Sequence, residues 1–195
     1  MGVQVAIKGR FSYLNVSEPK AKSKDKPNDL YYSTALIVPK DSESAKVMLK
    51  AEKEAFVEKF GEKKLKNGKV PSDYKWVKDG DEMKDDERKY GEECKDCYVI
   101  NASCKAAHRP ALVAGRDKHP ITADEVKSGD YGAIHVTVYG YEVDSSIKGV
   151  TAQFNHLLKI KTGEALGVKP IAVDAAFGDL PTDDMEFDSE EDTDY

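Results

Sequence analysis

The chain contains little cysteine, a single tryptophan and no long apolar run. Its three cysteines, an odd number, argue against a framework of disulfides and are typical of a reducing compartment. No apolar stretch is long enough to span a membrane, and the N-terminal residues MGVQVAIKGRF lack the apolar segment of a secretory signal. We therefore expect a cytoplasmic protein.

Signatures of the common enzyme classes are absent as well. The sequence has no Gly-x-Ser-x-Gly element, no Walker loop and no dinucleotide-binding fingerprint. Its four histidines, His108, His119, His135 and His156, are scattered without the spacing of metal ligands. We expect no catalytic residue, no metal ion and no cofactor.

The acidic residues gather at the C-terminus. Residues 179–195 hold nine carboxylates and no lysine or arginine, and the last residue is Tyr195. Removing those nine from the 36 acidic residues leaves 27 against 30 basic ones, so the net charge changes from −6 to +3. So acidic a segment cannot bury enough apolar surface to order itself, and we expect one domain over residues 1–178 and a disordered tail over 179–195. The tail either competes for a polyanion site on the body or only keeps the protein soluble.

Alternation of apolar and polar residues predicts five strands. They lie at residues 3–13, 31–38, 97–106, 132–144 and 150–161. Residues 61–96 are charged and turn-rich, and Thr122 with Glu125 fits a short capping box. Five strands without alternating helices indicate a mainly β fold, either a small barrel or a sandwich.

One substantial helix is expected between the second and third strands. Asp41 or Ser42 can cap its start, and Gly61 ends it after Phe60. Apolar residues recur along one face, which Glu52 interrupts.

Aromatic side chains recur beside basic or polar residues on the predicted strands. Exposed rings stack on unpaired bases while lysine and arginine contact phosphates, so the pattern suits a single-stranded nucleic acid. The alternative for each ring is a position in the core or on the sheet. The residues that we predict to bind are Arg10, Phe11, Tyr13, Tyr32, Trp76, Lys105, Arg109, Tyr139, Tyr141, Phe154, His156 and Lys159.

Two metal sites are conceivable. Cys94 and Cys97, followed by Cys104 and His108, supply enough ligands for one zinc ion, but the spacing fits none of the usual zinc motifs, and cysteines on a strand are more often small buried hydrophobes. The carboxylates of residues 79–87 suggest a divalent-metal nuclease. They lie in a turn-rich loop among lysines and an arginine, where solvated charge is the ordinary interpretation.

Several segments are similar to those of a known family. RFSYLNVSEPKA, YYSTALIVPKDS, DGDE, YVINASCKAAHRPALV, VTVYGYEVD, KGVTAQFNHLLKIKTGEALG and DAAFGD resemble, in that order, a bacteriophage single-stranded DNA-binding protein family with an OB-fold. The likeness covers most of residues 8–179. It departs from the family pattern at Phe154 and His156, which replace smaller or amide residues, and in its cysteine cluster.

The resemblance implies an OB-fold-like five-stranded barrel that binds single-stranded DNA without sequence preference and protects it during phage replication or recombination in the host cytoplasm. It also implies that the tail, through Asp192, Asp194 and Tyr195, recruits replication or recombination proteins and competes with DNA. The alternatives are a metal-dependent nuclease using residues 79–87 and a protein-interaction module whose tail mimics DNA. The sequence leaves the oligomeric state open, a homo-oligomer included.

Overall fold

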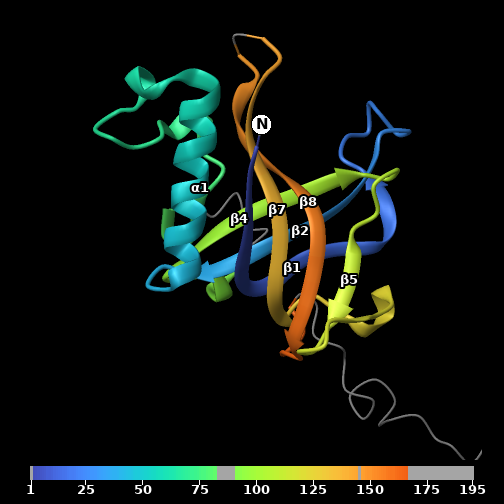
Figure 1. Ribbon diagram of the computed structural model, residues 1–195. Coiled ribbons are helices and arrows are strands. Elements are labelled where there is room, and N and C mark those ends of the chain that lie inside the picture. Colours follow the sequence, from blue (N-terminus) through green and yellow to red (C-terminus); the bar gives the residue numbers. More distant parts are fainter. Residues whose placement is uncertain (1, 83–90, 145, 167–195) are drawn as a thin grey trace, which may run out of the picture.

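The computed structural model describes residues 2–82, 91–144 and 146–166. Within these ranges the chain forms one eight-stranded sheet in the order β3-β4-β2-β1-β7-β8-β5-β6 (Figure 1). The strands are β1 (Val3–Ala21), β2 (Leu30–Pro39), β3 (Lys78–Asp79), β4 (Cys97–Lys105), β5 (Ala111–Ala114), β6 (His119–Pro120), β7 (Tyr131–Glu142) and β8 (Lys148–Lys161). The helical elements are α1 (Glu43–Phe60) and the short 3₁₀ turns η1 (Glu62–Lys64), η2 (Ser72–Tyr74), η3 (Gly80–Glu82), η5 (Glu92–Cys94) and η6 (Ala123–Glu125).

The strands β1, β2, β4, β7 and β8 close into a barrel. The first half of β1 pairs with β7 and its second half pairs with β2, the change of partner falling at Arg10. β2 pairs on its other side with β4, and β7 pairs on its other side with β8. A parallel contact between Ser103 and Gln153 joins β4 to β8 and closes the barrel. This closure confirms the prediction of a mainly β, OB-fold-like five-stranded barrel with a substantial helix.

β1 bends where it leaves one partner for the other. Tyr13 has a left-handed backbone with a φ of 45°, and the pairing with β2 slips between Ser12 and Asn15, which is the pattern of a β-bulge. Below the bend, a Cβ added to Gly132 would lie 2.5 Å from the Phe11 ring. Glycine at this position therefore lets β7 pass directly over that buried ring.

α1 lies along one side of the barrel and packs mainly on β1 and β7 (Figure 1). Of the two predicted caps, Asp41 and Ser42, it is Ser42 that caps the start, since its hydroxyl Oγ accepts a hydrogen bond from Ala45 N at 3.1 Å. Gly61 ends the helix with a φ of 86°, a conformation that glycine adopts without strain.

The structure explains the acidic residue on the apolar face of α1. Glu52 is buried, and its Oε1 accepts hydrogen bonds from the backbone nitrogens of Trp76 at 2.6 Å and Val77 at 2.7 Å. Burial raises the pKa of Glu52, while these two N–H groups oppose the rise. Glu52 thus ties the segment before β3 to the helix.

Several strand boundaries differ from the prediction. β1 continues to Ala21, although the proline and the lysine of its last residues predict a loop there. The last residues of β1 form a strand because they pair with the start of β2. The short strands β3, β5 and β6 have too few residues to show a period of two. The capping box of Thr122 and Glu125 is confirmed at η6. No helix among the described residues is long and apolar enough to cross a membrane.

Candidate nucleic-acid interface

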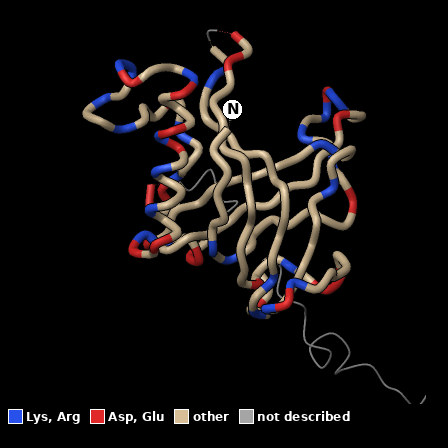
Figure 2. Tube along the Cα trace, viewed as in Figure 1, with Lys and Arg blue, Asp and Glu red and all other residues tan. Residues whose placement is uncertain are grey.

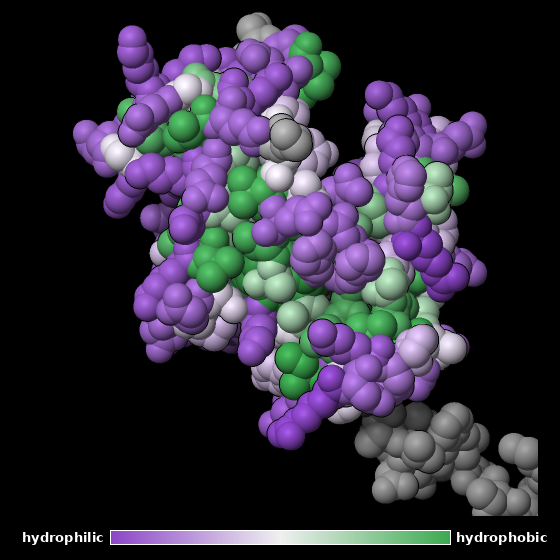
Figure 3. Space-filling view, viewed as in Figure 1, coloured by the Kyte–Doolittle hydropathy of each residue, from purple (hydrophilic) through white to green (hydrophobic). Residues whose placement is uncertain are grey.

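A groove opens at one end of the barrel, between the β1–β2 connection and the β7–β8 hairpin. Its volume is about 640 Å³, and its floor is formed by the end of β4 and the first half of β8. Figure 3 shows the notch between these two walls, and Figure 2 shows lysines along the β1–β2 connection. The groove is lined by Lys22, Tyr31, Ser103, Cys104, Lys105, His108, Tyr139, Tyr141 and residues 150–153.

Tyr139 and Tyr141 form one wall of the groove. They occupy outward positions of β7, because Val136 and Val138, which precede them with the opposite parity, point into the core. Tyr139 is 39% exposed. Tyr141 pairs with Gly149 across the hairpin, and its ring lies 3.5 Å from where a Cβ of that glycine would be. Aromatic rings placed on an open groove can stack on unpaired bases.

Lys22 and Tyr31 form the opposite wall. The Lys22 Nζ lies 4.2 Å from the centroid of the Tyr31 ring and donates a hydrogen bond to Ser103 Oγ at 2.6 Å. Burial lowers the pKa of Lys22, while the charge of Asp29 opposes this. A phosphate in the groove would favour the charged form of this lysine in the same way as a carboxylate does.

Asp29 places a negative charge behind this wall. Its carboxylate accepts a hydrogen bond from Tyr31 Oη at 2.8 Å and lies 4.0 Å from Lys105 Nζ. The hydrogen bond to Asp29 raises the pKa of Tyr31. Because Asp29 and a DNA phosphate carry charge of the same sign, they compete for Lys105.

A second hollow of about 400 Å³ adjoins the groove. Lys22 and Tyr31 line both spaces, and the second hollow also includes Tyr13 and Lys20. Tyr13 is 53% exposed, since the left-handed backbone at the bulge turns its side chain outward. Aromatic and basic groups thus follow one another from the β7–β8 hairpin to the bend of β1.

Three of the predicted stacking rings lie in the core instead. Phe11 is 0% exposed, Phe154 1% and Trp76 5%. The Trp76 Nε1 also donates a hydrogen bond to the carbonyl oxygen of Asn101 at 2.7 Å. A ring that is packed on all sides presents no face to a base, so we remove these three residues from the interface.

Tyr32 and Arg109 act together. Tyr32 is buried, and the Arg109 guanidinium lies 5.7 Å from the centroid of its ring. Arg109 remains exposed and donates a long hydrogen bond of 3.4 Å to the carbonyl oxygen of Val16. Arg109 can therefore contact a phosphate. Tyr32 holds the guanidinium through a cation–π contact and, being buried, is removed from the set of stacking rings.

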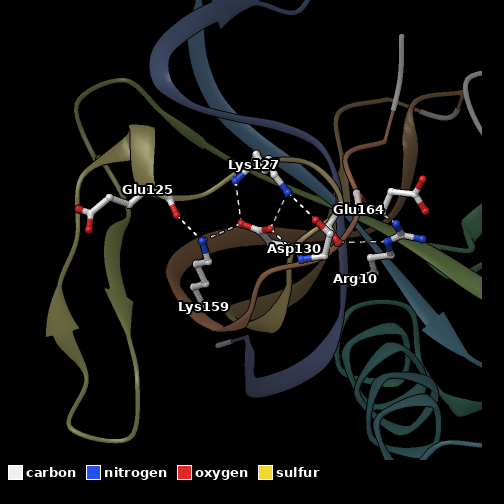
Figure 4. A network of polar contacts seen from close by, with 8 residues as sticks. Arg10, Glu125, Lys127, Asp130, Lys159 and Glu164 are labelled. Atoms are coloured by element: carbon white, nitrogen blue, oxygen red, sulfur yellow. Dashed lines mark hydrogen bonds and ion pairs between the residues drawn. The ribbon is translucent and has the colours of Figure 1, made fainter. Parts of the chain in front are cut away.

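Lys159 is engaged at the opposite end of the barrel. There Asp130 is fully buried, and its carboxylate lies 3.0 Å from the ammonium groups of both Lys127 and Lys159 (Figure 4). Burial by itself would raise the pKa of Asp130, but hydrogen bonds from Gly163 N, Lys159 and Lys127 lower it to about 2. Lys159 thus compensates a buried charge, and we remove it from the interface.

Arg10 belongs to the same end. Its Nη2 donates a hydrogen bond to the carbonyl oxygen of Glu164 at 2.8 Å, and its Nε donates to that of Gly129 at 3.1 Å (Figure 4). The guanidinium also lies 5.3 Å from the centroid of the Tyr131 ring. Arg10 therefore fastens the segment after β8 rather than lining the groove, and we remove it from the interface.

His156 lies on the outer face of β8. Its ring stacks on that of His135 with centroids 5.6 Å apart and an angle of 28° between the planes. Beside this pair, Asn155 Nδ2 donates a hydrogen bond to Thr137 Oγ1 at 2.9 Å. The structure places His156 beyond the residues that line the groove.

The four candidate zinc ligands do not converge. Cys97 and Cys104 lie near opposite ends of β4, about 23 Å apart at 3.3 Å per residue. Cys94 packs in an apolar cluster with Cys97, and burial raises its pKa to about 12. In the part of the chain that the structure describes, no group of three or more His, Cys, Asp or Glu residues is arranged to hold a metal ion.

The first carboxylates of the 79–87 cluster pair with one lysine. Lys40 Nζ lies 2.5 Å from Asp79 Oδ1 and 2.6 Å from Asp81 Oδ2, and hydrogen bonds to both raise its pKa. Residues 83–90 and 167–195 lie outside the described residues. These ranges hold Asp85, Asp86 and Glu87 of that cluster and the predicted tail contacts Asp192, Asp194 and Tyr195.

The sequence prediction did not include Lys22, Tyr31 or Ser103. The alternation along β2 could in part have predicted that Tyr31 faces outward. Tyr32 points to the same side of the strand as the buried Leu36, whereas Tyr31 points to the same side as Ser33. The signal is weak since Ile37, of the outward parity, is buried as well. Only the pairing of β2 with β4 brings the end of β4 beside the β1–β2 connection.

The sequence matches one family and the fold matches solved phage proteins. The profile of the family described as Enterobacter phage Enc34, ssDNA-binding protein, matches residues 3–190. The single-stranded DNA-binding protein from bacteriophage Enc34 in complex with ssDNA is 22% identical, with a TM-score of 0.65 over 84% of this chain and 89% of that chain.

Two further structures share the fold. The same Enc34 protein in another structure has 22% identity and a TM-score of 0.62 over 89% of each chain. The single-stranded DNA-binding protein gp2.5 encoded by bacteriophage T7 has 11% identity and a TM-score of 0.58, over 94% of this chain and 98% of that chain. None of the curated protein sequences is significantly similar to this chain.

Proposed function

This chain belongs to the family of the Enterobacter phage Enc34 ssDNA-binding protein, and from this membership we propose that it binds single-stranded DNA without sequence preference. The groove at the open end of the barrel is the proposed site. By coating whichever strand is open, the protein protects the template during phage replication or recombination. Because it binds duplex poorly, it shifts the equilibrium between duplex and single strands toward the single strands by mass action.

The arrangement of Tyr139 and Tyr141 opposite Lys22 and Lys105 supports this proposal most directly. Every base has a face that a tyrosine ring can stack on, and every nucleotide carries a phosphate that a lysine can contact. Such contacts hold a strand without reading base edges, which accounts for binding that is independent of sequence.

We propose in addition that the tail, residues 179–195, competes with DNA for the groove and recruits replication or recombination proteins. Its nine carboxylates and terminal Tyr195 carry the charge of a nucleic acid and an aromatic anchor for a partner's pocket. This role requires no catalysis, and the protein acts in the host cytoplasm by binding alone.

A salt-titrated binding assay with single- and double-stranded oligonucleotides, with and without magnesium, tests the proposal. We expect tight, salt-dependent binding of the single strand, weak binding of duplex and no cleavage. Cleavage that requires magnesium would point to the nuclease alternative. Absence of DNA binding at low salt would point to the module whose tail mimics DNA.

A further inference from the structure

A second groove lies at the other end of the barrel and is mainly apolar. It has a volume of about 580 Å³ between β1, the end of β2, the start of α1 and the ends of β7 and β8. Its apolar lining includes Ile37, Pro39, Cys97, Tyr131 and Ile160. Tyr131 is 41% and Ile160 56% exposed, so two large apolar side chains face solvent side by side.

The chain leaves the barrel beside this groove. Gly163 N donates to the buried Asp130 at 3.0 Å, Arg10 donates to the Glu164 carbonyl oxygen, and Leu166 N donates to the Ser128 carbonyl oxygen at 3.2 Å. The Leu166 side chain packs on the apolar cluster that contains Ile37 and Cys97, both of which also line the groove. Leu166, the last residue described at this end of the chain, therefore lies beside the groove.

The sequence that follows matches the groove in character. Residues 167–178 read GVKPIAVDAAFG, and the acidic tail begins at Asp179. From Pro170 to Phe177 every residue is apolar except Asp174. Lys8 and Arg10 line the groove together with Glu43 and Glu93, so its charged residues balance and the match to the segment is apolar. If an apolar segment docks in an exposed apolar groove, the apolar surfaces of both are removed from water, which is favourable.

We propose that residues 170–177 of the same chain dock in this groove, with Phe177 as the main apolar anchor. The docked segment sets the point from which the acidic tail starts. Tyr131 and Tyr141 mark the two ends of β7, about 33 Å apart at 3.3 Å per residue, so the tail starts at the end of the barrel away from the candidate DNA groove.

Docking changes the reach of the tail. A flexible chain of n residues has an r.m.s. extension of about 5–6 Å × √n, which is about 21–25 Å for the 17 residues after 178 and about 27–32 Å for the 29 residues after 166. The docked arrangement thus reduces contact between the tail and the DNA groove of the same molecule. It leaves the tail available to partners.

Disulfide trapping in the full-length chain tests the docking, with the native Cys97 as the reporter thiol in the groove. Ala176→Cys places a thiol next to Phe177, and Ser189→Cys places one in the acidic tail as the matched control. Burial raises the pKa of Cys97 and, more strongly, that of Cys94, which reaches about 12, so Cys94 competes little with Cys97. Under mild oxidation we expect the first variant to form an intramolecular disulfide with Cys97 at least tenfold faster than the second.

Further variants identify the contact. Cys97→Ser should abolish the fast product, and Ile160→Glu, at an exposed position that tolerates charge, should slow it several-fold. Equal rates for the two new thiols, or no effect of Ile160→Glu, would overturn the proposal. A covalent dimer as the fast product would also overturn it, since the occupant would then come from a second copy. Hydrogen exchange in the unmodified chain gives an independent answer, because docking requires slower exchange for 171–177 than for 179–195.

Discussion

The ammonium group of Lys22 lies 4.2 Å from the centre of the Tyr31 ring and is hydrogen-bonded to Ser103. This contact joins the β1–β2 connection to the end of β4 and builds one wall of the candidate DNA groove. It also holds a positive charge and an aromatic ring at the same place, which is the combination that a nucleotide with its phosphate and base requires.

Replacement of Tyr139 or Tyr141 by alanine should weaken binding of single-stranded oligonucleotides. A base loses its stacking surface, at a cost of about 1–3 kcal/mol per ring. Tyr131→Ala is the matched control, because Tyr131 is similarly exposed but lies at the other end of β7. Fluorescence anisotropy measures all three, and equal losses for Tyr131 and Tyr139 would contradict the placement of the groove.

Lys22→Ala should lower the salt dependence of binding. Each phosphate contact contributes about 0.7 to the slope of log K against log salt concentration for a single strand, so the slope should fall by about that amount. Lys46→Ala, at an exposed position on α1 outside the groove, should leave the slope unchanged. A slope that is the same in both variants would exclude a phosphate contact at Lys22.

Asp29→Asn should strengthen binding at low salt. The substitution removes a negative charge 4.0 Å from Lys105, and we expect a gain of about 0.5 kcal/mol that disappears as salt screens it. Affinities measured at two salt concentrations test this. Weaker binding at low salt would show instead that Asp29 is needed to position Tyr31.

Asp130→Asn should destabilise the fold by about 3 kcal/mol, because removal of a buried charge leaves two lysines without their partner. The folded pKa of Asp130 is about 2, below the ordinary value of about 3.9. Its contribution is therefore present above pH 4 and is lost as the pH falls toward 2. In urea unfolding, the difference in free energy of unfolding between wild type and variant should narrow over that range. Asp124→Asn, at an exposed position, is the control and should change the free energy of unfolding little at any pH.

Deletion of residues 179–195 should raise the affinity for single-stranded DNA, most at low salt, since the tail no longer competes for the groove. The same deletion should abolish recruitment of a replication or recombination partner. Removal of Tyr195 alone should spare most of the charge competition. If the truncated chain binds DNA no better at low salt, the tail does not compete.

The main strands and α1 could be predicted because their signals are local, whereas the choice of a barrel over a sandwich came from the family resemblance. Ser42 caps the helix, and apolar residues alternate along β7 and β8. Burial of Phe154 could also be inferred, since it shares its parity with Val150 and Ala152. The partners of Lys159 could not be predicted, because Asp130 lies 29 residues earlier and only the fold brings its carboxylate to 3.0 Å.

Photo-crosslinking of an oligothymidine to the full-length protein, followed by mass spectrometry of the crosslinked peptides, tests the central claim most directly. The groove predicts crosslinks at Tyr139, Tyr141, Tyr31 and Tyr13, all suppressed by competing single strand and little affected by duplex. Crosslinks confined to Tyr131 and the far end of the barrel would contradict the account.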